Sequence, residues 1–307
     1  MSLINVNELY FNKSIKTSPF YHYTSSEALV NIISKSSIRF THCAFLNDTE
    51  EYLYIDEVID DIVNENIDPE VSGFIKSMKK NLDHNYSGLI LKPADGKWFH
   101  PAVGEYYVLS GTSEPDSLPM WNYYVKTGNY YGYSIKMDVR ELYKMISPFL
   151  PAAGEFICGK VEYDKENQKK IVIDFTRQLL DDYNNRDIEE RERIIEDLQD
   201  TFFGFIQRTR LFFKREGFKH EKELRVVVLT DTDNNNRENF KVGYNTTKGL
   251  IKPYIEYTFT DKNLPIVHVK LSPTIEETIG IRGVGILLKN KHYEKVSVDK
   301  SELKLRF

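Results

Sequence analysis

Short apolar segments and longer amphipathic segments follow one another along the chain. Apolar residues in continuous or alternating positions indicate β-strands, expected near residues 20–23, 38–42, 106–110, 130–137, 156–163, 224–229, 239–244, 251–260, 265–271 and 295–305. Apolar residues three and four positions apart indicate helices, expected near residues 24–34, 48–62, 69–82, 119–124, 165–213 and 274–280 and from residue 138 onward. The mixture predicts an α+β fold with a mixed, mostly antiparallel sheet system and flanking helices.

The first helix has a recognisable start. Thr24 and Glu27 form a capping-box pair, with Thr24 at the N-cap and Glu27 three residues later. The apolar residues Leu29, Ile32 and Ile33 follow at helical spacing. The pattern predicts a strand that ends at residue 23 and a helix that begins directly after it.

The segment 165–213 is strongly helical and interrupts an otherwise strand-rich chain. We therefore expect a helical insertion within a single elaborated domain that spans residues 1–307. Phe202 and Phe205 lie on one side of the second helix of this insertion. We predict that this side packs next to the strand that carries residues 221–225. The alternative is a contact between two copies of the chain in a homodimer.

The composition is that of an ordinary globular protein, with 307 residues, 41% hydrophobic and 28% charged side chains. No apolar stretch approaches the roughly 20 residues needed to cross a bilayer, and the N-terminus lacks a signal pattern, so no membrane partner is expected. Two cysteines offer neither a disulfide framework nor metal spacing, which favours a cytoplasmic location. The net charge of −5 argues against broad nucleic-acid binding.

Two local features depart from this average composition. Between Arg208 and Arg225 there are seven Lys or Arg residues against three Glu, enough for a local anion or phosphate site. Of the 20 tyrosines, seven fall between Tyr106 and Tyr133. Such a cluster indicates either a half-wet groove that stacks a planar ligand or a sheet core faced with aromatics.

The segment 213–228 combines a charged run with a buried strand. Side chains on a strand alternate between faces, so Glu221, Glu223 and Arg225 are expected on one face and the apolar residues on the other. Grouped carboxylates on a rigid strand can bind a hydroxyl or stabilise a developing cation. The alternative is a structural ion pair. We predict that Arg225 pairs with Glu223, which leaves Glu221 as the freer carboxylate.

Several common site motifs are absent from the sequence. Residues 220–224 begin like the zinc-protease pattern H-E-x-x-H, but Leu224 stands where the second histidine is required. Neither the phosphate-binding motif G-x-x-x-x-G-K-[ST] nor the nucleophile motif G-x-S-x-G occurs. The seven histidines are scattered. No resident metal is therefore expected.

Four short patterns follow one another along the chain. Residues 21–25 read Y-H-Y-T-S, and residues 45–48 read F-L-N-D. Residues 120–124 read M-W-N-Y-Y and lead into the G-Y-S-I of residues 132–135, and residues 214–225 follow K-x3-F-x2-E-x-E-x-R. In this order the patterns resemble those of a bacterial family of domains of unknown function, DUF2971, which has F-x-N-D as its second pattern and usually Trp in place of Phe in its fourth.

The layout of this family is similar to the ADP-ribosyltransferase arrangement, and the resemblance implies NAD as a substrate. By position in the pattern, His22 on the first strand would hold the adenosine ribose, with Tyr23 and Thr24 beside it. Trp121 or Tyr124 would stack on the nicotinamide ring. In this arrangement the histidine and the aromatics orient the ligand.

The resemblance also implies the charged contacts of the site. Glu221 or Glu223 would bond the nicotinamide ribose, where a carboxylate favours the oxocarbenium-like transition state. Lys214 or Arg225 would offset the charge of the pyrophosphate. If the patterns form one site, His22, the aromatics and the glutamates border a single pocket, although about a hundred residues separate them along the chain.

Three function classes follow as hypotheses. The first is an NAD-dependent ADP-ribosyltransferase or NAD glycohydrolase, as found among bacterial toxins and phage-defence effectors; its ADP-ribose acceptor cannot be identified from the sequence. The second is a non-catalytic module that senses a nucleotide or nucleic acid on the same scaffold. The third is a metal-dependent nuclease that uses Asp48, Glu221 and Glu223. Release of nicotinamide from NAD separates the first from the second, and metal dependence singles out the third.

Overall fold

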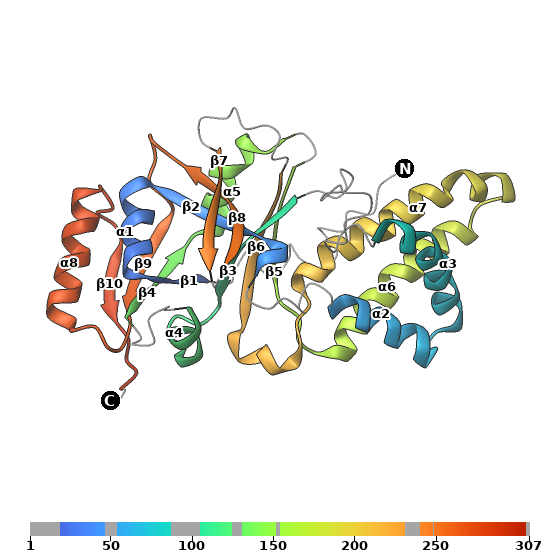
Figure 1. The fold of residues 1–307 in the computed structure, drawn as a ribbon, viewed down its shortest axis with the longest axis horizontal. Coiled ribbons are helices and arrows are strands. Elements are labelled where there is room, and N and C mark those ends of the chain that lie inside the picture. Colours follow the sequence, from blue (N-terminus) through green and yellow to red (C-terminus); the bar gives the residue numbers. More distant parts are fainter. Residues whose placement is uncertain are drawn as a thin grey trace. The chain divides into compact units, whose positions relative to one another are not determined.

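The computed structural model describes residues 19–46, 54–86, 105–124, 131–151, 154–230, 240–247 and 249–304 (Figure 1). The chain forms two compact units, each built from segments far apart in the sequence. The sheet unit consists of Met1–Leu46, Glu105–Lys160 and Lys219–Phe307, and the helical unit consists of Asn47–Gly104 and Val161–Phe218.

The described strands form one branched sheet in the sheet unit. They are β1 (Phe20–Ser25), β2 (Ser37–His42), β3 (Glu105–Thr112), β4 (Gly132–Met137), β5 (Glu155–Lys160), β6 (Glu223–Thr230), β7 (Phe240–Thr247), β8 (Leu250–Thr258), β9 (Ile266–Leu271) and β10 (Ser297–Lys300). The main order is β10-β9-β4-β1-β3-β2-β8-β7, and β6 pairs with β3 and β5. Only the pairing of β10 with β9 is parallel among these described strands. The predicted mixed, mostly antiparallel sheet is confirmed.

The sheet branches at β3. One edge of β3 pairs with β6 along its whole length. The other edge pairs with β2 near its start, at Tyr107 and Val108, and with β1 near its end, at Thr112. The backbone of residues 109–111 lies between these two pairings. Because β1 and β6 flank the same strand, residues far apart in the sequence meet there.

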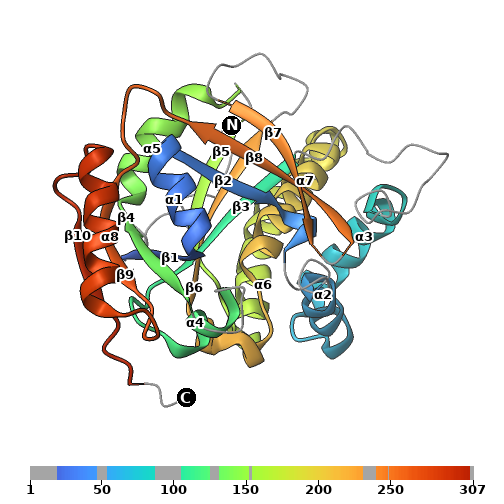
Figure 2. The same cartoon turned by 60° about the vertical axis from the view of Figure 1, so that its left-hand side comes forward.

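Helices flank the sheet, as predicted for an α+β fold. The described helices of the sheet unit are α1 (Ser26–Lys35), α4 (Leu118–Tyr124), α5 (Val139–Ile146) and α8 (Glu277–Asn290), with short 3₁₀ segments η2 (Cys43–Phe45) and η4 (Ser147–Phe149). α8 contacts α1, β9 and β10, and α4 contacts β1 (Figure 2).

The start of α1 differs by one residue from the prediction. Ser25, and not Thr24, is the N-cap, and its hydroxyl accepts a hydrogen bond from the Ala28 N–H at 3.2 Å. Thr24 still belongs to β1, where it pairs with Tyr133 of β4. The capping-box prediction for Thr24 is therefore wrong, because pairing with β4 extends the strand through Ser25.

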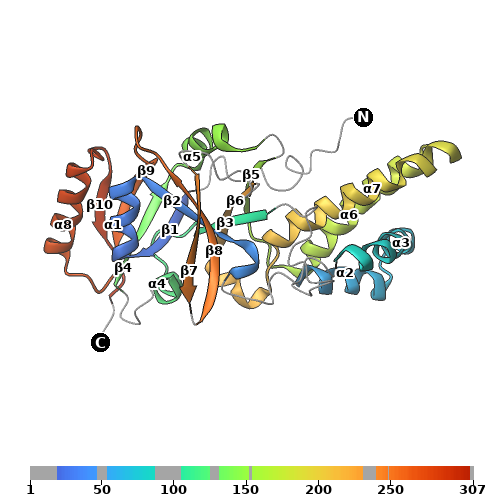
Figure 3. The same ribbon diagram turned by 45° about the horizontal axis from the view of Figure 1, so that its top comes forward.

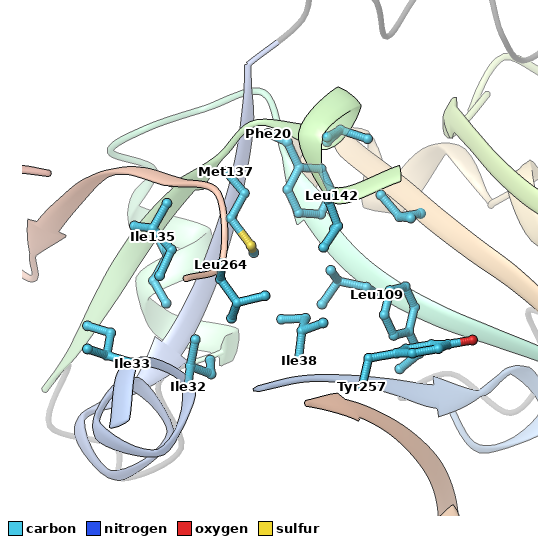
Figure 4. Packing of buried hydrophobic residues seen from close by; sticks show 14 of the residues in the cluster. Phe20, Ile32, Ile33, Ile38, Leu109, Ile135, Met137, Leu142, Tyr257 and Leu264 are labelled. Atoms are coloured by element: carbon cyan, nitrogen blue, oxygen red, sulfur yellow. The ribbon is translucent and has the colours of Figure 1, made fainter. Parts of the chain in front are cut away.

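The main core lies on one face of the sheet. Alternation in β1 and β4 directs Phe20 and Ile135 to this face, where both are 0% exposed (Figure 4). The helices α1 and α5 add Ile32, Ile33 and Leu142. Full burial of one such side chain stabilises the fold by about 1.5–3 kcal/mol. The opposite face of the same strands carries Tyr21 and Lys136, whereas His22 is on the face of Phe20 and Ile135.

The predicted helical insertion belongs to the helical unit. Its helices are α2 (Tyr54–Glu65), α3 (Pro69–Tyr86), α6 (Lys165–Asn184) and α7 (Ile188–Thr209), with the 3₁₀ segment η5 (Arg210–Phe212). α6 contacts α2, α3 and α7, and the four helices lie side by side (Figure 3). The segment 165–213 thus forms two helices, as predicted, and shares its compact unit with two helices from earlier in the chain.

Phe202 and Phe205 of α7 are buried within one chain, at 1% and 0% exposed. The ring of Phe205 stacks on that of Phe175 in α6, with centroids 3.8 Å apart and planes inclined by 10°. The two phenylalanines are therefore covered without a second copy of the chain, and the homodimer contact that was the alternative gains no support from them.

Two further expectations concern specific segments. The predicted turn at residues 47–48, including Asp48 of the nuclease hypothesis, lies outside the described residues. Of the helices that the structure describes, none combines the length and the apolar character that a membrane crossing requires.

Candidate functional site

Hydrogen bonds join the end of β3 to the start of β6. The hydroxyl of Thr112 donates toward the carbonyl oxygens of Glu221, at 2.8 Å, and Lys222, at 3.1 Å. The Ser113 N–H donates to the Lys222 carbonyl at 3.3 Å, and the Lys222 ammonium donates to the Glu114 carboxylate at 2.8 Å. Glu221 is thus held against a strand that lies 109 residues earlier in the chain.

Lys222 separates two backbone conformations. Its φ of 44° is in the left-handed region, which costs a non-glycine residue about 1–2 kcal/mol. Glu221 is the last residue of the 3₁₀ segment η6 (Glu216–Glu221), and β6 begins at Glu223. The prediction that Glu221 shares a strand face with Glu223 is therefore wrong, since strand alternation does not extend across Lys222.

Glu223 and Arg225 form the predicted ion pair. Arg225 donates from Nε to Oε1 and from Nη2 to Oε2 of Glu223, both at 2.8 Å. The two side chains are 2% and 1% exposed, so each charge is buried and satisfied by the other. Both carboxylate oxygens of Glu223 are engaged, which favours a supporting role for this residue. Glu221 is also buried, at 5% exposed.

His22 lies beside the part of β3 that neither β1 nor β2 pairs. Its Nδ1–H donates to the carbonyl oxygen of Ser110 at 2.8 Å. Burial lowers the pKa of His22 from the ordinary value of 6.5, and the hydrogen bond to Ser110 opposes this shift. The imidazole is therefore mainly neutral at pH 7, with Nδ1 as donor and Nε2 as acceptor.

His22 and the glutamate pair approach β3 from different faces. Tyr21 is the direct partner of Thr112, and Thr112 is the direct partner of Glu223, so these three share one face. His22, one residue after Tyr21, belongs to the opposite face. It nevertheless contacts β3 at Ser110, two residues before Thr112. The patterns meet at one strand, and the predicted single pocket stays a prediction.

Tyr23 and Trp121 form the aromatic part of the region. The Tyr23 hydroxyl donates to the Glu114 carbonyl at 3.0 Å and accepts from the Ser117 N–H at 2.9 Å. The two rings meet edge to face, with centroids 4.6 Å apart. Trp121 is 0% exposed and its Nε1 donates to Asp116 at 2.8 Å, so it supports the site from the core and offers no open face for stacking. The aromatic cluster consists of Tyr21, Tyr23, Met120 and Trp121.

The exposed ring of α4 is that of Tyr123, which was not among the predicted site residues. Tyr123 is 54% exposed, and its ring lies 5.7 Å from that of His220, the residue before Glu221. The predicted stacking residue Tyr124 is half-buried against the aromatic cluster. Thr24 is buried within β1 at 7% exposed.

Asp116 and the C-terminal segment 301–304 were also missed. Asp116 accepts from the Ser301 hydroxyl at 2.6 Å and from the Glu302 N–H at 2.8 Å, in addition to the indole. Leu303 packs against the aromatic cluster. No local spacing signals these contacts, because Ser301 follows Asp116 by 185 residues.

Lys214 belongs to the helical unit, and its predicted contact with a pyrophosphate stays a prediction. It is 5% exposed, and its ammonium lies 4.7 Å from the centroid of the Phe218 ring. Its N–H donates to the Glu162 carbonyl at 3.1 Å, and its own carbonyl accepts from the Gln168 amide at 3.0 Å. The cation–π contact needs an aromatic ring, which accounts for Phe where the family pattern has Trp.

Comparison with known proteins identifies one family. A family model described as a protein of unknown function, DUF2971, matches residues 120–226. The predicted resemblance to the DUF2971 family is therefore confirmed over these residues. The matched region runs from α4 into β6, so it contains the aromatic pattern and the E-x-E-x-R pattern, while His22 precedes it. No curated protein and no solved structure matches the chain.

Proposed function

We propose that the sheet unit binds NAD and cleaves its nicotinamide–ribose bond, as an ADP-ribosyltransferase-like enzyme. The observation that carries the proposal is the meeting of sequence-distant patterns at β3. His22 contacts Ser110 over 88 residues, and Thr112 contacts Glu221 over 109 residues. A buried carboxylate and a neutral histidine beside β3, together with the exposed ring of Tyr123 beside His220, fit recognition of a nucleotide.

The chemistry assigned to the site is stabilisation of a developing cation. When the bond between nicotinamide and ribose breaks, its electron pair leaves with nicotinamide and positive charge develops at the ribose carbon. A fixed carboxylate favours this transition state more than the ground state. We assign this role to Glu221, because Glu223 is bonded to Arg225. Water, or an acceptor still to be identified, then bonds to the ribose carbon and gives up its proton.

The other residues orient the ligand. With Nδ1–H bound to Ser110, His22 presents Nε2 as an acceptor to a ribose hydroxyl. The stacking role predicted for Trp121 passes to Tyr123 or Tyr124, since the indole has no exposed face. Arg225 fits a supporting role better than the predicted pyrophosphate contact, because Glu223 offsets its charge.

The test is release of nicotinamide from NAD by the purified full-length chain. We expect Glu221→Gln to lower the rate about 100-fold. Glu223→Gln is expected to lower the melting temperature, because it removes the negative charge that pairs with the buried guanidinium of Arg225. The exposed Glu294 supplies a matched control, and Glu294→Gln should leave rate and stability unchanged. Wild-type protein that releases no nicotinamide contradicts the enzymatic proposal.

A second candidate is a non-catalytic nucleotide-binding module. It is favoured by the bidentate Arg225–Glu223 pair, because this pair gives one of the two predicted catalytic carboxylates a structural role. In this case NAD raises the melting temperature and stays intact. If NAD does not raise the melting temperature of the protein and is not cleaved, both candidates are contradicted. The nuclease hypothesis gains no support, since no three His, Cys, Asp or Glu side chains among the described residues are grouped to hold a metal ion.

A further inference from the structure

A row of polar residues crosses four strands on the face opposite the core. The register aligns Tyr21 of β1 with Lys136 of β4, Lys136 with His268 of β9, and His268 with Ser297 of β10. Directly opposite residues share a face, so these side chains lie on one surface. The proposed NAD site uses none of the residues of β9 or β10.

Within this row, His268 connects a hydroxyl to a carboxylate. Its Nδ1 lies 2.8 Å from Ser297 Oγ, and its Nε2 lies 3.0 Å from Asp299 Oδ1. A carboxylate accepts only, so in the neutral imidazole Nε2 carries the hydrogen and Nδ1 accepts from the Ser297 hydroxyl. The Lys270 ammonium, 2.8 Å from the same oxygen of Asp299, fixes the carboxylate in place.

We propose that Ser297 is an activated nucleophile with His268 as its general base and Asp299 as the group that orients the imidazole. The relation of the three side chains is that of a serine–histidine–aspartate triad, with the roles of the two ring nitrogens exchanged. A triad is recognised by these contacts and not by the order of its residues along the chain.

The matching chemistry is reaction with a small activated acyl ester. Ser297 Oγ bonds to the carbonyl carbon while its proton passes to Nδ1 of His268. The bond to the leaving alkoxide then breaks, and the alkoxide takes that proton from His268. Water hydrolyses the acyl-serine by the same transfers in reverse, which restores the hydroxyl.

The position of the three residues allows such a compound to reach them. Ser297 is exposed, Asp299 is 53% exposed and His268 is 18% exposed. β10 is the last strand of the described sheet order. The Ser301 N–H bonds to β9, so strand alternation turns the N–H of Val298 to the outer edge. The N–H of the residue after a nucleophile is a common oxyanion donor.

The test uses a fluorophosphonate probe, which reacts with activated serines and loses fluoride. The wild-type full-length chain is labelled, digested and mapped by mass spectrometry. Ser77 is a matched reference within the same chain, since it is exposed but its hydroxyl donates to the Phe74 carbonyl. We expect Ser297 to be labelled at least about 100-fold faster than Ser77, the scale of general-base catalysis.

Variants separate activation from simple exposure. Ser297→Ala should abolish the labelled peptide, and His268→Gln should slow labelling of Ser297 about 100-fold. Ser77→Ala should leave it unchanged. Labelling of Ser297 no faster than that of Ser77 in the wild-type chain overturns the proposal and makes the three contacts a structural cross-strand ladder. The comparison of Ser297 with Ser77 is made in the wild-type chain, so it does not depend on whether a variant folds. It also does not depend on whether the protein cleaves NAD.

Discussion

On one face of β4 and β9 lie Ile135 and Val269, each 0% exposed, and on the other face of β1, β4 and β9 lie Tyr21, Lys136 and His268. The apolar pair belongs to the main core, where burial alone stabilises it. The polar residues are joined to named partners at defined distances. A single step along each strand therefore changes a residue from the core face to the polar face.

The two faces differ in how strongly their stability depends on the exact positions of the side chains. Burial is not directional, so the apolar face tolerates changes that conserve volume. A hydrogen bond or ion pair is lost when one partner moves, and a buried charge without its partner is costly. The loss of stability caused by a substitution on the apolar face should therefore increase with the side-chain volume removed. On the polar face it should increase with the number of hydrogen-bond or ion-pair partners that the substitution leaves unsatisfied.

The largest effect is expected from Arg225→Met, which removes the guanidinium bonded to both carboxylate oxygens of the buried Glu223. We expect a loss of about 3–5 kcal/mol in the free energy of unfolding, measured by urea denaturation. The double variant Glu223→Leu with Arg225→Met should recover most of the loss, because it removes both charges. Lys222→Met is the control, since its ion pair with Glu114 is exposed and worth at most about 1 kcal/mol. Equal effects of Arg225→Met and Lys222→Met would contradict this account.

A core substitution sharpens the comparison. Ile135→Ala removes a fully buried side chain and should cost about 3 kcal/mol, since the surroundings collapse only partly into the cavity. Lys136→Ala, one residue further on the polar face, should change stability by less than about 1 kcal/mol. Both are measured by urea denaturation. A larger loss for Lys136→Ala than for Ile135→Ala would show that the two faces have been assigned the wrong way round.

Much of the fold could be predicted from the sequence because its signals are local. The periods of apolar residues predicted the mixed, mostly antiparallel sheet and the two helices of 165–213. The Glu223–Arg225 pair was also predicted, since residues two apart on a strand share a face. Errors arose where one residue changes the backbone. The left-handed conformation of Lys222 separates Glu221 from the strand, and pairing with β4 extends β1 through Ser25.

The candidate site was less accessible to prediction because its contacts are non-local. The bond from His22 to Ser110 depends on where β1 and β2 leave β3 unpaired, and no local pattern encodes this. Asp116 meets Ser301 only because the C-terminal segment returns to α4. Trp121 illustrates a further limit. Its place in a sequence motif is the same whether the side chain is buried in the core, as it is here, or contacts a ligand.

A smaller effect is expected from Asp116→Ala, in the segment between β3 and α4. The variant removes the acceptor of the Ser301 hydroxyl, the Glu302 N–H and the Trp121 indole. We expect a loss of about 1–3 kcal/mol, together with faster trypsin cleavage after Lys300 as the C-terminal segment is released. Glu302→Ala keeps the backbone N–H that Asp116 accepts from and is the control. If cleavage after Lys300 is equally fast in both variants, Asp116 does not hold the segment.

The smallest effect is expected from the pH dependence that His22 contributes. Burial lowers the folded pKa of His22 below its unfolded value of 6.5, so the unfolded chain binds more protons just below that pH. The contribution of His22 to stability is therefore fully present above pH 6.5 and is lost progressively as the pH falls below it. His22→Asn removes the titrating group and keeps a side-chain N–H that can bond the Ser110 carbonyl. Urea denaturation at pH 7.5 and pH 5.5 should show a smaller difference in the variant than in the wild type. An unchanged difference would mean that His22 is as well solvated as in the unfolded chain, and its assignment as the neutral acceptor of a ribose hydroxyl would then lose its basis.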